Sequence, residues 1–229
     1  MPERPFFTRE LFRFFLDLEM NNNREWFHAN QSRYEEHVKA PALRFITEFG
    51  SHLYRISHHF RADPRPVGGS LFRIHRDIRF SKDKRPYKTH CGIQFRHASG
   101  ASAHAPGYYL HLEPGSCLVA AGTWHPDNPT LKQIRDAIVA RPERWRAALA
   151  DRRFRARYEL DGDRLKRVPR GYPADHPCAG DLMWKDYYGV CGLTQREVLS
   201  RDFMTLFAAI CRDATPYVKF LCEAIGVEF

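Results

Sequence analysis

The chain has 229 residues and a formal net charge of +9, with 36 lysines and arginines against 27 aspartates and glutamates. This length can bury a substantial core, and no apolar run approaches the roughly 18 to 20 residues that cross a membrane. The basic balance favours acidic partners such as nucleotides, nucleic acid or phosphorylated metabolites, although solvated surface arginines can also produce it. Neither a Gly/Ser-rich linker nor a repeat of fixed period divides the chain, so a single domain over residues 1–229 is expected.

The N-terminal quarter of the chain is predicted to be helical. Thr8 can cap a first helix, and Asn23 can cap a second. Apolar residues recur after Thr8 at the helical spacing i, i+3, i+4 and i+7, namely Leu11, Phe14, Phe15 and Leu18. Pro41 marks either a kink or the first turn of a third helix, because proline has no N–H to donate inside a helix.

The middle of the chain has the two-residue alternation that is typical of β-strands. The expected strands cover residues 71–80, 92–96, 108–113 and 117–124. Pro114-Gly115 favours a tight turn, so the last two strands are expected to form a hairpin.

The C-terminal part returns to helical spacing. Helices are expected after Asn128-Pro129, around Trp145, and across a final segment that Thr215-Pro216 bends or divides. The whole pattern predicts an α+β domain in which N- and C-terminal helices flank a central, mainly antiparallel sheet.

The segment from Arg73 to Tyr87 combines strand alternation with many charges. Its apolar residues fall on one side of an extended strand, namely Phe72, Ile74, Ile78 and Phe80. If the predicted strands pair antiparallel, one face of the sheet is apolar and the other collects polar side chains. The members of that polar face are Arg73, His75, Asp77, Arg79, Gln94, Arg96, Tyr109, His111 and Glu113.

Part of this segment matches the pattern Arg-x-x-Arg-Asp-x-Arg-Phe-x-x-x-Asp/Asn-Lys-x-x-Tyr. The matching residues are Arg73, Arg76, Asp77, Arg79, Phe80, Asp83, Lys84 and Tyr87. On these residues the chain resembles a bacterial family of hypothetical proteins, domain of unknown function 2461. The likeness extends to the stretches 22–27, 108–124 and 165–171. The resemblance implies one fold over most of the chain and supplies no reaction.

The arginines of this segment suit an anionic ligand, because the planar guanidinium makes bidentate hydrogen bonds to phosphate or carboxylate. Arg73, Arg79 and Lys84 are expected to converge on one pocket, where they would bind a small, phosphate-bearing anion. The full set of expected ligand-binding residues is Arg73, Arg76, Arg79, Lys84, Tyr87, Arg167 and Arg170.

Each part of this binding hypothesis has a structural alternative. The signature arginines can form salt bridges with Asp77, Asp83 or Glu113. The stretch around Arg167 and Arg170 can be a solvated basic loop.

If the protein is an enzyme, its expected proton-transfer residues are His75, Asp77 and His111, which lie on the polar face beside arginines. Those arginines would keep Asp77 ionised and stabilise negative charge that develops on a phosphoryl or acyl group. Either histidine can equally be a hydrogen-bonding structural residue. None of the six cysteines is expected to be a nucleophile, because Cys211 and Cys222 sit in apolar helical patterns and no other cysteine has a helix-start position that would clearly lower a thiol pKa.

No metal ligands and no cofactor are assigned from the sequence. His58-His59 and His176-Pro177-Cys178 lack the spacing that places ligands around zinc. Walker, dinucleotide-binding and nucleophile-elbow motifs are absent from the sequence. The first residues lack a secretory signal pattern, and there is no Cys-x-x-Cys pair, so a cytoplasmic location with reduced thiols is expected.

Three functions therefore compete. The first is binding of a small anion on the polar face of the sheet, with or without catalysis. The second is a nucleic-acid-binding module, which the charge favours but for which a basic helix, a zinc knuckle and an aromatic RNP-like strand are all missing. The third is a structural or interaction protein in which the signature segment is only an ion-paired scaffold. No membrane partner is expected, and the sequence indicates no oligomeric state.

Overall fold

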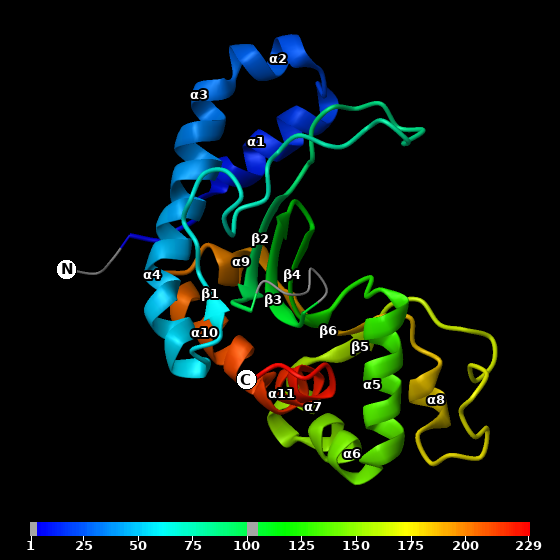
Figure 1. Ribbon diagram of the computed structural model, residues 1–229. Helices are drawn as coiled ribbons and strands as arrows, with labels where there is room; N and C mark the ends of the chain where they lie inside the picture. The colour runs from blue at the N-terminus through cyan, green and yellow to red at the C-terminus, as the bar shows by residue number, and fades with distance from the viewer. Residues whose placement is uncertain (1–3, 100–104) are drawn as a thin grey trace.

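The centre of the molecule is a six-stranded sheet with the order β1-β2-β3-β4-β6-β5, in which every neighbouring pair is antiparallel. The arrangement comes from a computed structural model that describes residues 4–99 and 105–229 (Figure 1). The strands are β1 (Phe60–Arg61), β2 (Cys91–His97), β3 (Gly107–Glu113), β4 (Ser116–Thr123), β5 (Glu159–Asp161) and β6 (Tyr187–Leu193).

Helices at the N-terminal end cover one side of the molecule (Figure 1). They are α1 (Arg9–Met20), α2 (Arg24–Ala29), α3 (Gln31–Tyr34), the π-helical turn η1 (Glu35–Lys39) and α4 (Ala40–Ile56). Asn23 caps α2 as predicted, since its side chain accepts a hydrogen bond from the Trp26 N–H at 2.9 Å. Thr8 occupies the N-cap position of α1 without a capping hydrogen bond from its side chain. Pro41 lies in the first turn of α4, directly after η1.

The remaining helices follow β4 in the chain. They are α5 (Asn128–Ala140), α6 (Pro142–Ala150), α7 (Arg152–Arg157), α8 (Ala179–Leu182), α9 (Gln195–Val198), α10 (Phe203–Asp213) and α11 (Thr215–Ala224). Ala214 separates α10 from α11, so Thr215-Pro216 divides the final helical segment rather than only bending it. Proline at the second position of α11 explains this division, because it removes a backbone donor and fixes φ.

One face of the sheet packs against helices, and the other is partly open. Ile93, Leu110 and Val119 stand in one cross-strand row and are fully buried. On the same side, the Phe95 ring lies 4.6 Å from that of Phe49 on α4 and 5.8 Å from that of Phe207 on α10. The predicted α+β class with a flanked antiparallel sheet is therefore confirmed, while β1, β5 and β6 were not predicted.

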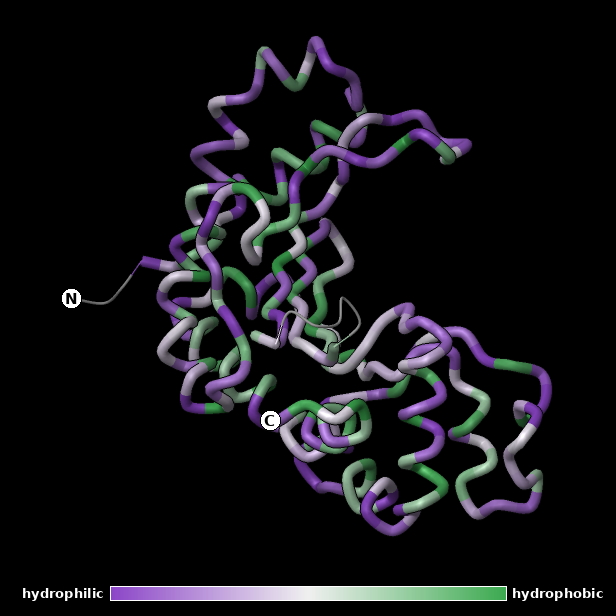
Figure 2. Tube along the Cα trace, in the orientation of Figure 1, coloured by the Kyte–Doolittle hydropathy of each residue, from purple (hydrophilic) through white to green (hydrophobic). Residues whose placement is uncertain are grey.

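The predicted strand over residues 71–80 is wrong. Residues 72–88 form an irregular projecting hairpin, here called the arm, which is predominantly hydrophilic toward its tip (Figures 1 and 2). Phe72 donates one backbone hydrogen bond to Gly92 of β2, after which the arm bonds to itself through Arg76 N–H to Pro86 O and Lys88 N–H to Ile74 O.

Local hydrogen bonds compete with strand pairing in the arm. Asp77 accepts from the backbone N–H of Arg79, and Asp83 accepts from that of Arg85. Such turns offer the backbone an alternative to a sheet ladder. The expected apolar stripe does not face a core at the arm's tip, because Phe80 is 95% exposed.

No helix in the described part of the chain combines the length and apolarity needed to cross a membrane. The six cysteines are all buried and free. The cytoplasmic location stays a prediction.

Candidate functional site

A cavity of about 600 Å³ lies on the open face of the sheet. It exists because the middle strands carry small residues at facing positions. Gly107 of β3 pairs with Gly122 of β4, and Ala120 lies two residues before Gly122 on the same face. Gly122 has a φ of 127°, and a Cβ atom there would collide with the backbone of Tyr187, so a larger residue does not fit.

Aromatic and polar side chains surround this hollow. Gln94 of β2, Tyr109 of β3 and Val190 of β6 belong to one cross-strand row that passes through Ala120. Trp124 borders the cavity and is 67% exposed. The lining also includes Phe72, Lys88, His90, His111, Asp161 and Tyr188. Three residues of the predicted polar face, Gln94, Tyr109 and His111, thus line one cavity.

Cationic groups gather at the β2 end of the cavity. Lys88 Nζ donates to the carbonyl of Arg73 at 3.0 Å and lies 5.2 Å from the ring centre of Phe72. The Arg96 guanidinium lies 5.8 Å from the same ring centre and donates to Gln94 at 3.0 Å. Burial, with a smaller contribution from Arg73, lowers the pKa of Lys88 below its usual value.

A short chain of hydrogen bonds runs along β3 beside the cavity. The hydroxyl of Tyr109 lies 3.0 Å from His111 Nδ1, and His111 Nε2 lies 3.1 Å from Glu113 Oε2. Thr89 donates to the other carboxylate oxygen of Glu113 at 2.9 Å. Burial alone would raise the pKa of Glu113, but the hydrogen bonds from His111 and Thr89 outweigh it and lower that pKa. The ionised carboxylate can only accept, so His111 Nε2 carries the proton and Nδ1 accepts from Tyr109.

His90 stacks beside this chain, with its ring centre 4.3 Å from that of His111. Burial, and then the electrostatic influence of His111, lowers the pKa of His90 to about 4. His90 therefore stays neutral at physiological pH. Sequence reasoning missed this residue and Lys88. The signal was available for His90, because it directly precedes the buried Cys91 at the start of β2 and so points to the opposite face.

The arm holds most of the predicted anion-binding residues, and its charges pair with one another. Arg79 lies 2.7 Å from Asp77, and Asp83 lies 2.6 Å from Arg76 and 2.8 Å from Arg85. These ion pairs agree with the alternative interpretation, in which the signature arginines form salt bridges with Asp77 and Asp83. Hydrogen bonds from the Arg79 side chain and backbone lower the pKa of Asp77 to about 2.

The other signature residues have different surroundings. Lys84 donates to the carbonyl of Ile78 at 3.1 Å. Tyr87 is buried, and its ring stacks on Phe27 at 4.2 Å. The backbone of Tyr87 also exchanges two hydrogen bonds of 3.0 Å with the side chain of Asn22, so this residue fastens the base of the arm to the helical layer.

The remaining predicted residues do not line the sheet cavity. His75 and Asp77 are exposed on the arm, and Arg73 is exposed beside Lys88. Arg167 and Arg170 are exposed on the segment between β5 and α8, which Figure 1 draws in yellow at the opposite end of the molecule from the tip of the arm. Of the proton-transfer candidates, His111 is the one that borders the cavity.

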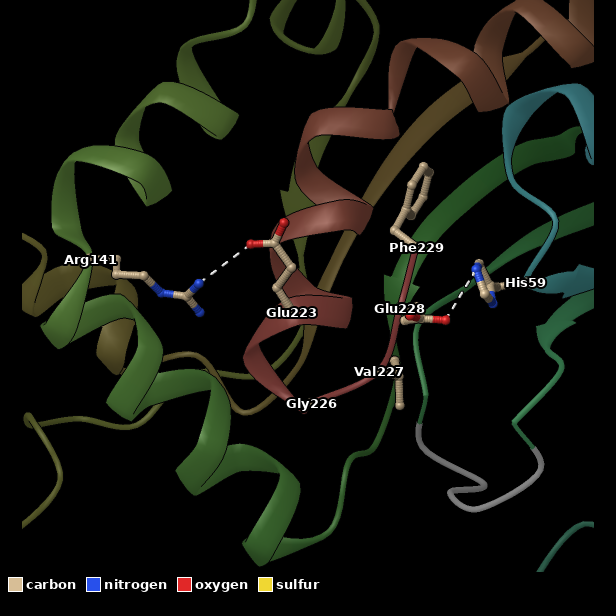
Figure 3. Close-up of a pocket in the computed structure, with 7 residues that line it drawn as sticks. All are labelled: His59, Arg141, Glu223, Gly226, Val227, Glu228 and Phe229. Atoms are coloured by element: carbon tan, nitrogen blue, oxygen red, sulfur yellow. Dashed lines mark hydrogen bonds and ion pairs between the residues drawn. The ribbon is translucent and has the colours of Figure 1, made fainter.

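A second cavity of about 550 Å³ lies beside the C-terminal segment (Figure 3). Its ionisable side chains face one another: Arg141 lies 3.4 Å from Glu223, and His59 lies 3.6 Å from Glu228. Glu223 is further paired with Arg144 at 2.7 Å. Because Arg141 and Arg144 already pair with Glu223, the second cavity is the poorer candidate for an anionic ligand.

The cysteines have no feature of reactive thiols. Burial raises the pKa of the Cys91 and Cys222 thiols to about 12, and that of Cys211 well above its usual value. A neutral, buried thiol is a poor nucleophile.

The fold and this site define an α+β protein whose antiparallel sheet is covered by helices on one face and carries a cavity on the other. The chain belongs to the family described as conserved hypothetical protein (DUF2461), whose model matches residues 10–220. This match confirms the resemblance found on the signature residues. No curated protein and no solved structure matches the chain.

Proposed function

We propose that this protein binds a small anionic, phosphate-bearing ligand in the cavity on the open face of its sheet. The observation that carries the proposal is the group of cations without carboxylate partners at the β2 end of this cavity. Among the residues that the structure describes, Arg73, Lys88 and Arg96 take part in no salt bridge. Positive charge that is close together and not neutralised attracts an anion.

The cations of the arm are weaker candidates. The guanidinium groups of Arg76, Arg79 and Arg85 already lie within 2.8 Å of aspartate oxygens. A phosphate would have to displace those aspartates before it could bind these arginines. We therefore propose that the anion binds beside Lys88, Arg96 and Arg73, and not at the ion-paired arginines of the arm.

The other lining residues suit a ligand that is larger than a bare phosphate. Tyr109, Trp124 and Tyr188 offer aromatic surface, and Asp161 of β5 lies at the far edge of the sheet from Lys88. A ligand with an anionic end and a flat or polar remainder would match both ends of the cavity.

Catalysis in this cavity would depend on His111. The Glu113 carboxylate orients its ring, and the ring's Nδ1 faces the hydroxyl of Tyr109 at the cavity. Because Nε2 faces Glu113 and Nδ1 accepts from Tyr109, a proton from a bound hydroxyl group or water would reach His111 through the Tyr109 hydroxyl, which would pass its own proton to Nδ1 and take up the ligand's.

Calorimetric titration with adenosine 5′-monophosphate, and with adenosine as its uncharged counterpart, tests the proposal. We expect the monophosphate to bind at least about tenfold more tightly, because charge-assisted hydrogen bonds contribute roughly 1.5 to 3 kcal/mol each. Trp124 fluorescence should change on binding. The variant Lys88→Met should lose most of this preference, whereas Arg79→Met, which removes an arm cation, should keep it.

Two results would contradict the proposal. Equal binding of the monophosphate and the nucleoside would show that the cavity does not recognise negative charge. Tight binding of duplex or single-stranded nucleic acid with a steep dependence on salt, without binding of the monophosphate, would favour the nucleic-acid-binding alternative.

A further inference from the structure

Three potential metal ligands meet at one end of the β2–β3 ladder. His90, His111 and Glu113 each offer a ligand atom, and these atoms all lie within 4.8 Å of one another. The pair His111 Nε2 and Glu113 Oε2 is already 3.1 Å apart. Two ligands of a tetrahedral zinc ion, each about 2.0 to 2.1 Å from the metal, are separated by about 3.3 Å. Small side-chain rotations of His90 would complete such a site.

The strand register explains why these three residues come together. Cys91 faces Leu112 across the ladder, so the preceding residue, His90, stands opposite Glu113. Side chains alternate along a strand, which places His111 and Glu113 on the same face. His90 shares that face because its neighbour Cys91 points into the core.

The donor set is suited to a divalent transition metal. Two imidazoles and one carboxylate bind zinc and also ferrous iron, and the carboxylate supplies a negative charge. We propose that His90, His111 and Glu113 form a binding site for one divalent transition-metal ion, with Zn²⁺ as the reference ion.

Neighbouring side chains orient two of the three ligands. Thr89 donates to Glu113 Oε1 at 2.9 Å, which leaves Oε2 to face the histidines. The hydroxyl of Tyr109 lies 3.0 Å from His111 Nδ1. When a metal replaces the proton on Nε2, that proton moves to Nδ1, where the Tyr109 oxygen can accept it. Such outer partners fix the tautomer and the ring orientation of metal-binding histidines.

Gly92 makes room for the Tyr109 contact. A Cβ atom at position 92 would lie 2.7 Å from the Tyr109 hydroxyl and 3.1 Å from the Phe72 ring. Any larger residue would therefore push the Tyr109 ring away from its place beside His111.

The metal site would border the sheet cavity, since His90 and His111 both line it. Three protein ligands leave at least one coordination position for water or for a group in the cavity. The inference does not depend on the proposed anion, because the metal ligands are side chains of the protein alone.

Competition between the purified protein and a chromogenic chelator for Zn²⁺ tests the site without any other ligand. We expect one ion per chain. Loss of an outer partner lowers metal affinity by roughly 10- to 100-fold, so Tyr109→Phe should lower the Zn²⁺ affinity by about that factor. The variants His90→Ala and Glu113→Gln each remove a ligand, so each should lower the Zn²⁺ affinity by more than that. The control His58→Ala removes an exposed histidine that stacks on Tyr54, and should bind as the unaltered protein does.

Visible absorption of the Co²⁺-loaded protein provides a second test that needs no variant. Four-coordinate Co²⁺ has intense d–d bands, and these should be displaced stoichiometrically by Zn²⁺. Absence of a one-to-one complex, or equal affinities for the unaltered protein and a folded Glu113→Gln variant, would overturn the proposal. If a variant fails to fold by circular dichroism, absence of the Co²⁺ bands from the unaltered protein overturns it instead. Because no anion is added, the metal site and the anion site can fail separately.

Discussion

At the scale of single residues, two buried tyrosines differ in whether the hydroxyl group has a hydrogen-bond partner, and this difference decides whether the hydroxyl stabilises or destabilises the fold. The hydroxyl of Tyr158 donates to the carbonyl of Ile210 at 3.1 Å. The hydroxyl of Tyr217 is buried and has no partner among the residues that the structure describes. An unsatisfied buried hydroxyl costs about 1 to 3 kcal/mol, whereas a satisfied one contributes about 1 kcal/mol.

The same substitution should therefore have opposite effects at these two positions. We expect Tyr217→Phe to raise the free energy of unfolding by about 1 kcal/mol and Tyr158→Phe to lower it by about 1 kcal/mol. Urea denaturation followed by circular dichroism measures both. A loss of stability in both variants would mean that Tyr217 has an unrecognised partner.

His90 gives a prediction of pH dependence. Its pKa is lowered to about 4 by burial and by the neighbouring His111, against 6.5 for an unperturbed histidine. Between pH 6.5 and about 4 the unfolded chain binds a proton at this position that the folded chain does not, so His90 makes folding less favourable as pH falls through that window. NMR titration of the imidazole resonances of the metal-free protein measures the pKa. A midpoint near 6.5 would contradict the prediction.

At the scale of elements, the arm combines a fixed base with an exposed tip. The ring of Tyr87 at its base is buried against Phe27, while Phe80 at its tip is exposed. A repeated local pattern shapes the chain here, because Asp77-Ile78-Arg79 and Asp83-Lys84-Arg85 each close a turn through the aspartate. The same pattern occurs at Asp63-Pro64-Arg65, before the arm.

Substitution of these two aromatic residues should affect the free energy of unfolding to different extents, because one lies at the buried base and the other at the exposed tip. We expect Tyr87→Ala to lower the free energy of unfolding by roughly 3 kcal/mol, which is typical of truncating a buried aromatic ring. Phe80→Ala should change it by less than about 0.5 kcal/mol, as exposed substitutions do. Denaturant titrations of the two variants provide the comparison. Similar losses would show that the tip of the arm packs against another part of the protein.

At the scale of the whole molecule, α10 joins the N-terminal helices to the sheet. The ring of Phe207 on α10 lies 4.7 Å from that of Phe49 on α4 and 5.8 Å from that of Phe95 on β2. Trp145 on α6 packs at 5.1 Å against Phe220 on α11, so the C-terminal helices continue the same core. A continuous core favours unfolding in one step.

We expect thermal and denaturant unfolding of the unaltered chain to be a single cooperative transition, with coincident changes in tryptophan fluorescence and circular dichroism. Phe207→Ala should lower the free energy of unfolding by about 3 to 5 kcal/mol and shift both signals together. Two separate transitions would show that the chain contains two independently folding units, contrary to the expected single domain.

Local patterns along the chain are enough to predict several of the elements. Apolar spacing located the long helices, Asn23 identified a cap, and the alternation along β2 and β3 assigned Tyr109 and His111 to the open face. The signature residues also identified the family. These features depend on neighbours along the chain, which the sequence contains directly.

The contacts of the polar residues on this face, by contrast, depend on how distant segments of the chain come together. Alternation between Arg73 and Phe80 predicted a strand, but local turns at Asp77 and Asp83 and pairing within the arm prevail. The approach of His90 to Glu113 depends on the register between β2 and β3, and the hollow beside them depends on Gly107 meeting Gly122 across a ladder. Cross-strand register is a long-range property, set by the packing of all six strands against the helices, and no local pattern in the sequence determines it.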